Sequence, residues 1–158
     1  MNIQTSKGFT IVEVLVSMVI LAIGVLGLGV MQITSLQNTQ GGQMRSQATI
    51  LAYDMIDTMR TNSPSVTSGA YNIGFADETP AATECYGAEA NCTSAEMATS
   101  DINHWRTSLA ASLPSGNGFI AAGDAGTTNR VSVIITWIDP YAADQGSERV
   151  TIQSELSK

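Results

Sequence analysis

KGFTIVEVLVSMVILAIGVLGLGVMQ, residues 7–32, is the stretch that decides how this chain folds. From Phe9 to Met31 the only formally charged side chain is Glu13. As a helix, this run would be roughly 35 Å long at about 1.5 Å per residue, enough to cross a hydrocarbon core of about 30 Å. A carboxylate near the front of the run is unusual, because its burial in lipid is unfavourable. The stretch therefore predicts a membrane-crossing helix with one residue, Glu13, that needs a separate explanation.

The apolar run and the residues that flank it do not fit a conventional secretory signal. Such a signal is cut after its apolar stretch, at small residues, and an Ala-x-Ala-like site is hard to find here. If a segment is removed, the plausible junction is Gly8–Phe9, which leaves the apolar helix on the mature protein. Lys7 and the initial amine are the positive groups of the leader, so the leader is expected in the cytoplasm and everything after residue 32 outside.

GFTIVE at residues 8–13, followed by an unbroken apolar helix, resembles the N-terminal signature of type IV pilins and type II secretion pseudopilins. The resemblance implies that a prepilin peptidase cuts after Gly8 and that the new N-terminal Phe9 is N-methylated. It places Glu13 at the fifth mature position, where the family has its glutamate. It also implies an α+β, pilin-like fold, in which a long N-terminal helix packs against a small antiparallel β-meander.

The length of 158 residues allows one compact domain and one long helix. We expect a leader at 1–8, a hydrophobic transmembrane or filament-core helix at 9–33, its amphipathic continuation at 34–62, and a periplasmic globular domain at 63–158. In the continuation, apolar residues recur at helical spacing from Ala48 to Met59, which predicts one buried stripe. Gly41-Gly42 predicts a bend or a loosened turn, since each glycine costs roughly 1 kcal/mol in a helix interior.

The remaining residues predict loops, a second helix and three strands. Residues 63–92 have turn chemistry, and Tyr71, Ile73 and Phe75 form a short strand or pack on the helix. The second helix is expected from 95 to about 113, with Thr93 and Glu96 as a capping box. Strands are expected at 119–122, 130–138 and 148–156, joined as an antiparallel meander that covers the stripe of the long helix.

The two cysteines, Cys85 and Cys92, lie in a polar, loop-like stretch. Outside the cytoplasm such a pair persists as a disulfide, which is our expectation; two free thiols would need a reducing compartment. The spacing is not that of a zinc site, and His104 is the single histidine, so we expect no metal. His104 is interpreted as a surface or half-buried residue without a special role.

Charge and motifs exclude several classes of function. The formal net charge is −7, and loss of the leader with its Lys7 makes the side-chain total −8. Without a basic cluster, the chain is a poor candidate for binding nucleic acid or anionic lipid surfaces. No catalytic constellation or phosphate-binding loop is visible, so we expect neither enzyme activity nor a cofactor. Asp77, Glu78 and Asp101 are interpreted as solvated.

Glu13 has two interpretations. In the first, it lies near the membrane surface and reaches into the headgroups. In the second, it pairs with the positively charged amine that cleavage creates on Phe9 of a neighbouring subunit, because neither charge alone is tolerated in an apolar helix bundle. The pair would favour one axial offset between neighbours, which is similar to the subunit-docking role of this glutamate in the family. An intramolecular pair is also possible, since both groups lie on one helix.

The stretch from about residue 85 to 139 is similar to the minor pilin group called PilV, the type IV pilus modification proteins. This likeness implies a minor pilin that supports pilus biogenesis or priming and pilus-dependent adhesion or motility. Its expected partners are major and minor pilins, the prepilin peptidase, the inner-membrane assembly machinery and, before assembly, the membrane. We expect it in the inner membrane first and at the cell surface later. A type II secretion pseudopilin and a plain single-span protein with a periplasmic domain are the alternatives.

Overall fold

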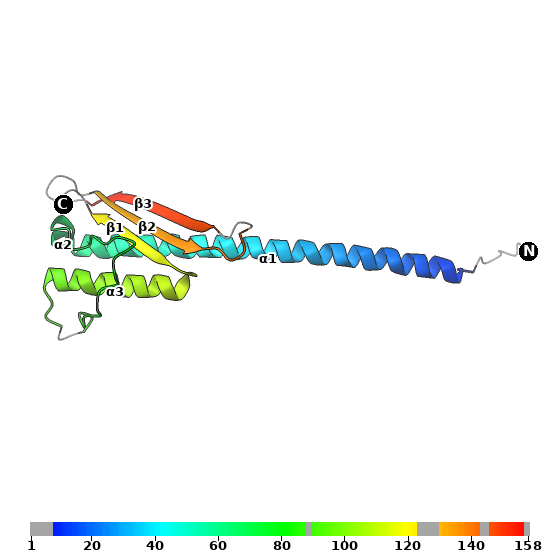
Figure 1. The fold of residues 1–158 in the computed structure, drawn as a ribbon, viewed down its shortest axis with the longest axis horizontal. Helices are drawn as coiled ribbons and strands as arrows, with labels where there is room; N and C mark the ends of the chain where they lie inside the picture. Colours follow the sequence, from blue (N-terminus) through cyan, green and yellow to red (C-terminus); the bar gives the residue numbers. More distant parts are fainter. Residues whose placement is uncertain (1–7, 88–89, 123–129, 143–145, 157–158) are drawn as a thin grey trace, which may run out of the picture. The chain divides into compact units, whose positions relative to one another are not determined.

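The computed structural model describes residues 8–87, 90–122, 130–142 and 146–156. The chain divides into a stem unit, Met1–Thr39, and a head unit, Gln40–Lys158. Helix α1 (Ile11–Thr61) begins in the stem unit and ends in the head unit. The other elements belong to the head unit: α2 (Ser63–Thr67), α3 (Ser94–Ser112), β1 (Asn117–Ala122), β2 (Arg130–Ile138) and β3 (Ser147–Glu155) (Figure 1). The predicted α+β class is confirmed.

The three strands form the antiparallel meander that the alternation of apolar residues predicts. Their order is β1-β2-β3, and Val133 of β2 lies between Ile120 of β1 and Ile152 of β3. Along β2, Val131, Val133, Ile135 and Trp137 are buried and the residues between them are not. One face of the sheet therefore belongs to the core, as a period of two residues requires.

The core of the head unit is one cluster shared by the sheet, α3 and the later part of α1. The predicted stripe is confirmed at Ala48, Ala52, Met55, Ile56 and Met59, which are all buried. α3 lies alongside α1 within the head unit (Figure 1), and Trp105 Nε1 donates to the carbonyl oxygen of Leu51 at 3.0 Å. The buried face of the sheet, the apolar side of α3 and the stripe of α1 therefore share one core.

Helix α1 is continuous at Gly41-Gly42, so the loosened turn predicted there is wrong. A penalty of about 1 kcal/mol per glycine is small beside the cooperative hydrogen bonding of a long helix. Gly41 also has a packing reason, because a Cβ at this position would lie 2.9 Å from Asp139 Oδ2. The β2–β3 connection can approach α1 at Gly41 because no side chain stands in its way.

The prediction of a loop throughout residues 63–92 is wrong at its start, where α2 forms. Pro64 lies in the first turn of this short helix, where its missing N–H is not needed. Beyond α2, Tyr71 is buried, and Ile73 exchanges two backbone hydrogen bonds with Ile120. Phe75 packs its ring on Phe119 with 5.5 Å between centroids. The segment thus adds a single bridge to β1 rather than a fourth strand.

The predicted capping box of α3 is confirmed. Thr93 Oγ1 accepts from the Glu96 backbone N–H, and the Glu96 carboxylate accepts from the Thr93 backbone N–H at 2.8 Å. After α3, the turn into β1 needs Gly116, and β1 itself needs Gly118. A Cβ on Gly116 would lie 2.4 Å from the Leu109 carbonyl oxygen, and one on Gly118 would lie 2.2 Å from the Trp105 ring. These glycines allow β1 to pass directly over α3.

Candidate functional site

The start of α1 holds the residues that the sequence singles out. Gly8 and Phe9 precede the helix and are exposed, with the Phe9 side chain 82% accessible. Thr10 caps the helix, since its Oγ1 and its carbonyl oxygen both accept from the Glu13 backbone N–H, at 3.3 and 3.1 Å. The Gly8–Phe9 bond therefore lies in non-helical, accessible backbone. The rest of the predicted leader, residues 1–7, lies outside the described residues.

Glu13 lies in the first turn of α1 and is exposed. Within the described ranges its carboxylate makes no hydrogen bond or ion pair; only its backbone is engaged, by the Ser17 hydroxyl at 2.7 Å and by the Thr10 cap. The helix N-terminus favours a negative charge at this position. Among the described residues, the structure brings no partner to the Glu13 carboxylate, so its charge is available to another group.

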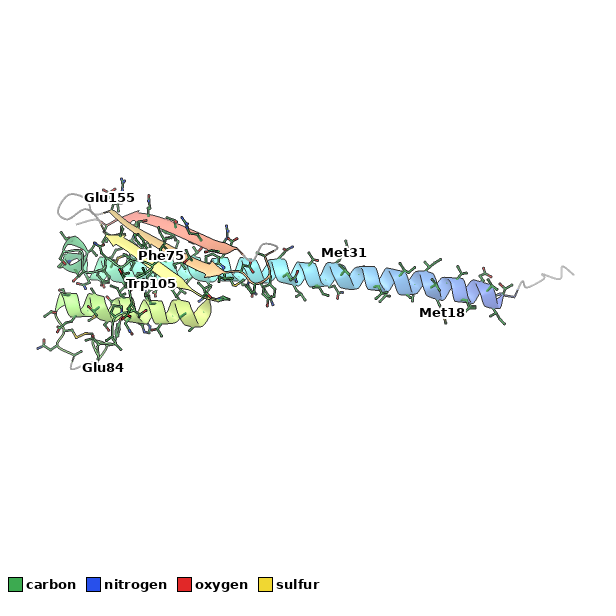
Figure 2. All side chains as sticks on the ribbon, viewed as in Figure 1. Met18, Met31, Phe75, Glu84, Trp105 and Glu155 are labelled. Carbon is green, nitrogen blue, oxygen red and sulfur yellow. A yellow bond between two sulfur atoms is a disulfide. The ribbon has the colours of Figure 1, made fainter. Side chains whose placement is uncertain are left out.

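The stem part of α1 presents apolar side chains on every side. Figure 2 shows Met18 and Met31 standing out from the helix with no other side chain over them, and both are largely exposed. The best 18-residue window of α1 has a mean hydropathy of 2.7, and none of it is buried. By length and composition this helix can cross a membrane. So much exposed apolar surface is stable only against lipid or against other apolar helices.

Two family models match the chain across these elements. The prokaryotic N-terminal methylation motif matches residues 3–29, which include Gly8, Phe9 and Glu13. The model described as type IV pilin Tt1218 matches residues 30–103, from the middle of α1 into α3. The chain is type IV pilin-like. No curated protein and no solved structure matches this pilin-like chain.

The head unit of this pilin-like chain has a buried polar centre on α3 that the sequence did not predict. Asp101 is 4% exposed, so its interpretation as a solvated residue is wrong. Its two carboxylate oxygens accept from the Tyr71 and Tyr86 hydroxyls, each at 2.5 Å. Burial and the bond to Asp101 raise the pKa of both phenols above the ordinary tyrosine value. Asn62 extends the centre by donating to the Tyr71 oxygen and to the Ser94 carbonyl oxygen.

A second polar residue of α3, Arg106, is 5% exposed and was missed. Its guanidinium donates to the backbone carbonyl oxygens of Gly74, Asp77 and Gly118. Burial lowers the pKa of the guanidinium below its ordinary value, and the Asp77 charge opposes this shift. Arg106 fastens the 74–77 turn to α3 and to β1. Its helical spacing from Ile102 and Leu109 places it beside the apolar stripe of α3, and this spacing was the sequence signal that could have predicted its burial.

Cys85 and Cys92 form a disulfide, as the sequence predicts, with their Cα atoms 5.8 Å apart. Cys92 immediately precedes Thr93, so the bond ties the preceding loop to the start of α3. His104 is exposed, and its ring lies 5.8 Å from the ring of Tyr86. Among the described residues, no three side chains of His, Cys, Asp and Glu gather as metal ligands.

Proposed function

We propose that this pilin-like chain is a minor pilin subunit of a type IV pilus, assembled through its N-terminal helix. One observation carries the proposal: an accessible Gly8–Phe9 junction directly precedes α1, the Glu13 carboxylate has no partner among the described residues, and the described chain leaves the apolar surface of the stem part uncovered. A helix with this much exposed apolar surface is unfavourable in a soluble domain. A subunit that moves from lipid into a helical bundle needs all three features.

Processing comes first in this proposal. A prepilin peptidase cuts after Gly8, removes the cytoplasmic leader and exposes the amine of Phe9, which is then N-methylated. The motif match over residues 3–29 and the capped, accessible start of α1 support this step. The chain is a substrate in this reaction and breaks no bond itself. Residues 9–33 act as the anchor, 34–62 as its continuation, and 63–158 as the globular domain.

Glu13 guides the assembly step. The new amine on Phe9 carries a positive charge, and the free Glu13 carboxylate of a neighbouring subunit can neutralise it. In a low dielectric, two opposite charges attract strongly, whereas either one alone is strongly disfavoured. The contact therefore selects one axial offset between neighbouring helices. The alternative interpretation is that Glu13 lies near the membrane surface and reaches into the headgroups.

The proposal also assigns location and partners. Before assembly the subunit spans the inner membrane once, with its leader in the cytoplasm and its head unit in the periplasm. The pilus assembly machinery then extracts it, and the apolar helix exchanges lipid for the helices of major and minor pilins. The likeness of residues 85–139 to the PilV group supports a minor subunit that promotes pilus biogenesis or priming, and pilus-dependent adhesion or motility.

The first test is the intact mass and N-terminal peptide of the protein, recovered separately from membranes and from sheared surface filaments. The proposal expects a mature chain that starts at methylated Phe9 and is present in the sheared fraction. The same mature chain found only in membranes would favour a secretion pseudopilin instead. An unprocessed start at Met1 would leave a plain membrane-anchored domain and would overturn the proposal.

Two substitutions separate processing from assembly. Glu13→Ala is expected to leave cleavage largely intact and to reduce recovery in sheared filaments, on the order of tenfold if one charge pair is lost. Ser17→Ala, one turn further along the same exposed helix, is the matched control and should assemble normally. Equal recovery of Glu13→Ala and wild type would contradict the docking role.

Gly8→Leu tests the cleavage junction. A bulky side chain before the scissile bond is expected to block processing, so the protein should keep its leader and stay in the membrane fraction. Mass spectrometry of the purified full-length chain reads the outcome directly. A normal mature mass in this variant would show that the cut lies elsewhere.

A further inference from the structure

The loop that precedes α3 is fastened to the polar side of that helix. Asn103 Nδ2 donates to the Pro80 carbonyl oxygen at 2.6 Å, and Ser100 Oγ donates to the Thr83 carbonyl oxygen at 2.8 Å. Next along the loop, the Tyr86 hydroxyl donates to Asp101 Oδ1 at 2.5 Å. α3 therefore presents its apolar side to the core and uses its polar side to hold this loop.

The disulfide closes the last part of the same loop, from Cys85 to Cys92. Cys85 is buried and directly precedes Tyr86, while Cys92 directly precedes Thr93, the N-cap of α3. Because α3 is rigid and begins at this cap, the disulfide fixes Tyr86 relative to Asp101, two turns further along the helix. Without the bond, Tyr86 would belong to a longer and less restricted loop, which reduces its effective concentration at Asp101.

Asp101 depends on Tyr71 and Tyr86 for the hydrogen bonds to its two carboxylate oxygens. Its carboxylate is buried, and within the described part of the chain no arginine, lysine or histidine pairs with it. A buried carboxylate without a cation is tolerated only when donors satisfy its oxygens. Tyr71 supplies one donor from the turn after α2, and Tyr86 supplies the other from the disulfide-bounded loop.

We propose that the Cys85–Cys92 disulfide and the Tyr86–Asp101 hydrogen bond form one coupled, redox-sensitive latch on the head unit. Oxidation of the two thiols transfers two electrons and two protons to a disulfide oxidant, which becomes a dithiol. The new bond restricts the loop and places Tyr86 on Asp101. By linkage, the hydrogen bond stabilises the disulfide to the same extent as the disulfide stabilises the hydrogen bond.

The latch gives the head unit two levels of stability. The reduced chain is expected to keep the core formed by the sheet, α1 and α3, because neither cysteine belongs to that hydrophobic cluster. It leaves one oxygen of Asp101 without its fixed donor, so the start of α3 and the loop before it open more often. Oxidation completes the polar centre. This inference concerns the head unit alone and stands whether or not the chain is a pilus subunit.

The test measures the disulfide equilibrium of the purified full chain in detergent against dithiothreitol. Dithiothreitol gives up two electrons and two protons and closes to its cyclic disulfide, and each protein sulfur gains one of each. In Tyr86→Phe the disulfide is expected to be reduced more readily, by about three- to tenfold in the equilibrium constant, because its coupled hydrogen bond is absent. Tyr141→Phe, an exposed tyrosine at the β2–β3 connection, is the matched control and should equal wild type.

A second measurement keeps the proposal testable in the absence of the disulfide. Tyr86→Phe is expected to lower Tm by about 3–6 °C in the oxidised protein and by less than about 2 °C in Cys85→Ser/Cys92→Ser. If the double serine variant does not fold, the dithiothreitol equilibrium decides alone. An equilibrium constant for Tyr86→Phe equal to that of wild type, or equal Tm losses in both backgrounds, would overturn the coupling.

Discussion

Helix α1 contains two regions that are both helical but differ in what covers them. In its stem part, up to Thr39, the side chains are the most apolar of the chain, and none is buried. In its head part, from Gln40, one stripe of apolar residues (Ala48, Ala52, Met55, Ile56 and Met59) is buried, while Ile50 and Tyr53 on other faces stay exposed. Burial therefore follows the available partner and not the hydrophobicity of the helix. The more apolar region is the one whose partners lie outside the chain.

The largest difference is expected between two matched isoleucines of α1. Ile56→Ala removes a side chain that is 0% exposed, and should lower the free energy of unfolding of the head unit by about 2–5 kcal/mol. Ile20→Ala, at a site 65% exposed, should leave it unchanged. Denaturant unfolding of the full chain in detergent, followed by the fluorescence of Trp105 and Trp137, measures both. Equal losses would break the comparison.

Two glycines test the same difference between the covered head unit and the uncovered stem part of α1. Gly118→Ala places a Cβ 2.2 Å from the Trp105 ring, which is rigid and buried, so we expect a loss of about 1–3 kcal/mol. Gly27→Ala in the stem part of α1 meets nothing within 4 Å and should leave head unfolding as it is. The same fluorescence assay applies. A neutral Gly118→Ala would mean that β1 does not approach α3 as closely as described.

A smaller effect, in the stabilising direction, tests whether α1 is continuous. Gly42 lies in the helix with open space around it, so Gly42→Ala should raise the free energy of unfolding by about 0.5–1 kcal/mol. Gly41→Ala should gain less or become destabilising, because its Cβ meets Asp139 Oδ2 at 2.9 Å. The difference between the two unfolding midpoints is the measurement. Destabilisation by Gly42→Ala would contradict a continuous α1 and support a loosened turn at this position.

The smallest expected effect is a pH dependence at the start of α3. Bonds from the Thr93 backbone N–H and hydroxyl lower the pKa of Glu96 below the ordinary glutamate value. A carboxyl with a lowered folded pKa stabilises the fold above its unfolded pKa, and this contribution is lost as the pH falls through its folded pKa. The stability gap between wild type and Glu96→Gln should therefore shrink from about pH 5 to pH 3. A constant gap would contradict the capping role.

The same Thr-x-x-Glu pattern begins both helices, with different outcomes. At α3 the Glu96 carboxylate returns to the Thr93 backbone, whereas at α1 only the Thr10 half of the box is formed. Glu13→Gln removes no such capping bond and is the control variant for the preceding experiment. The sequence alone could not separate the two, because both glutamates satisfy the local rule.

Local periodicity predicted most of the fold. The alternation along residues 130–138 matches β2 in its bounds, and the stripe from Ala48 to Met59 is the buried face of α1. These signals are strong because one buried face imposes a period over many residues. The prediction of a loop at 63–67 was wrong because Pro64 can begin a helix as well as end one.

The polar centre could not be predicted in the same way. Asp101 is one residue from Ile102 on α3, and its burial depends on tyrosines 15 and 30 positions away in the chain. No local pattern links these residues, because a carboxylate is buried only when distant donors arrive at it. The burial of Arg106 was easier to predict. Its position is four residues after Ile102 and three before Leu109, on the side of α3 that faces the core, where a guanidinium must either reach solvent or be satisfied by hydrogen bonds.

Two contacts between α1 and β3 have a mechanical consequence. Arg45 pairs with Glu148, and Arg60 donates to Ser154. These positions are about 22 Å apart on the helix, at about 1.5 Å per residue, and about 20 Å apart on the strand, at about 3.3 Å per residue. The strand thus runs beside the helix in the same direction with matched attachment points. Tension along this part of α1 loads both attachments together, in shear, and does not peel the sheet away from one end.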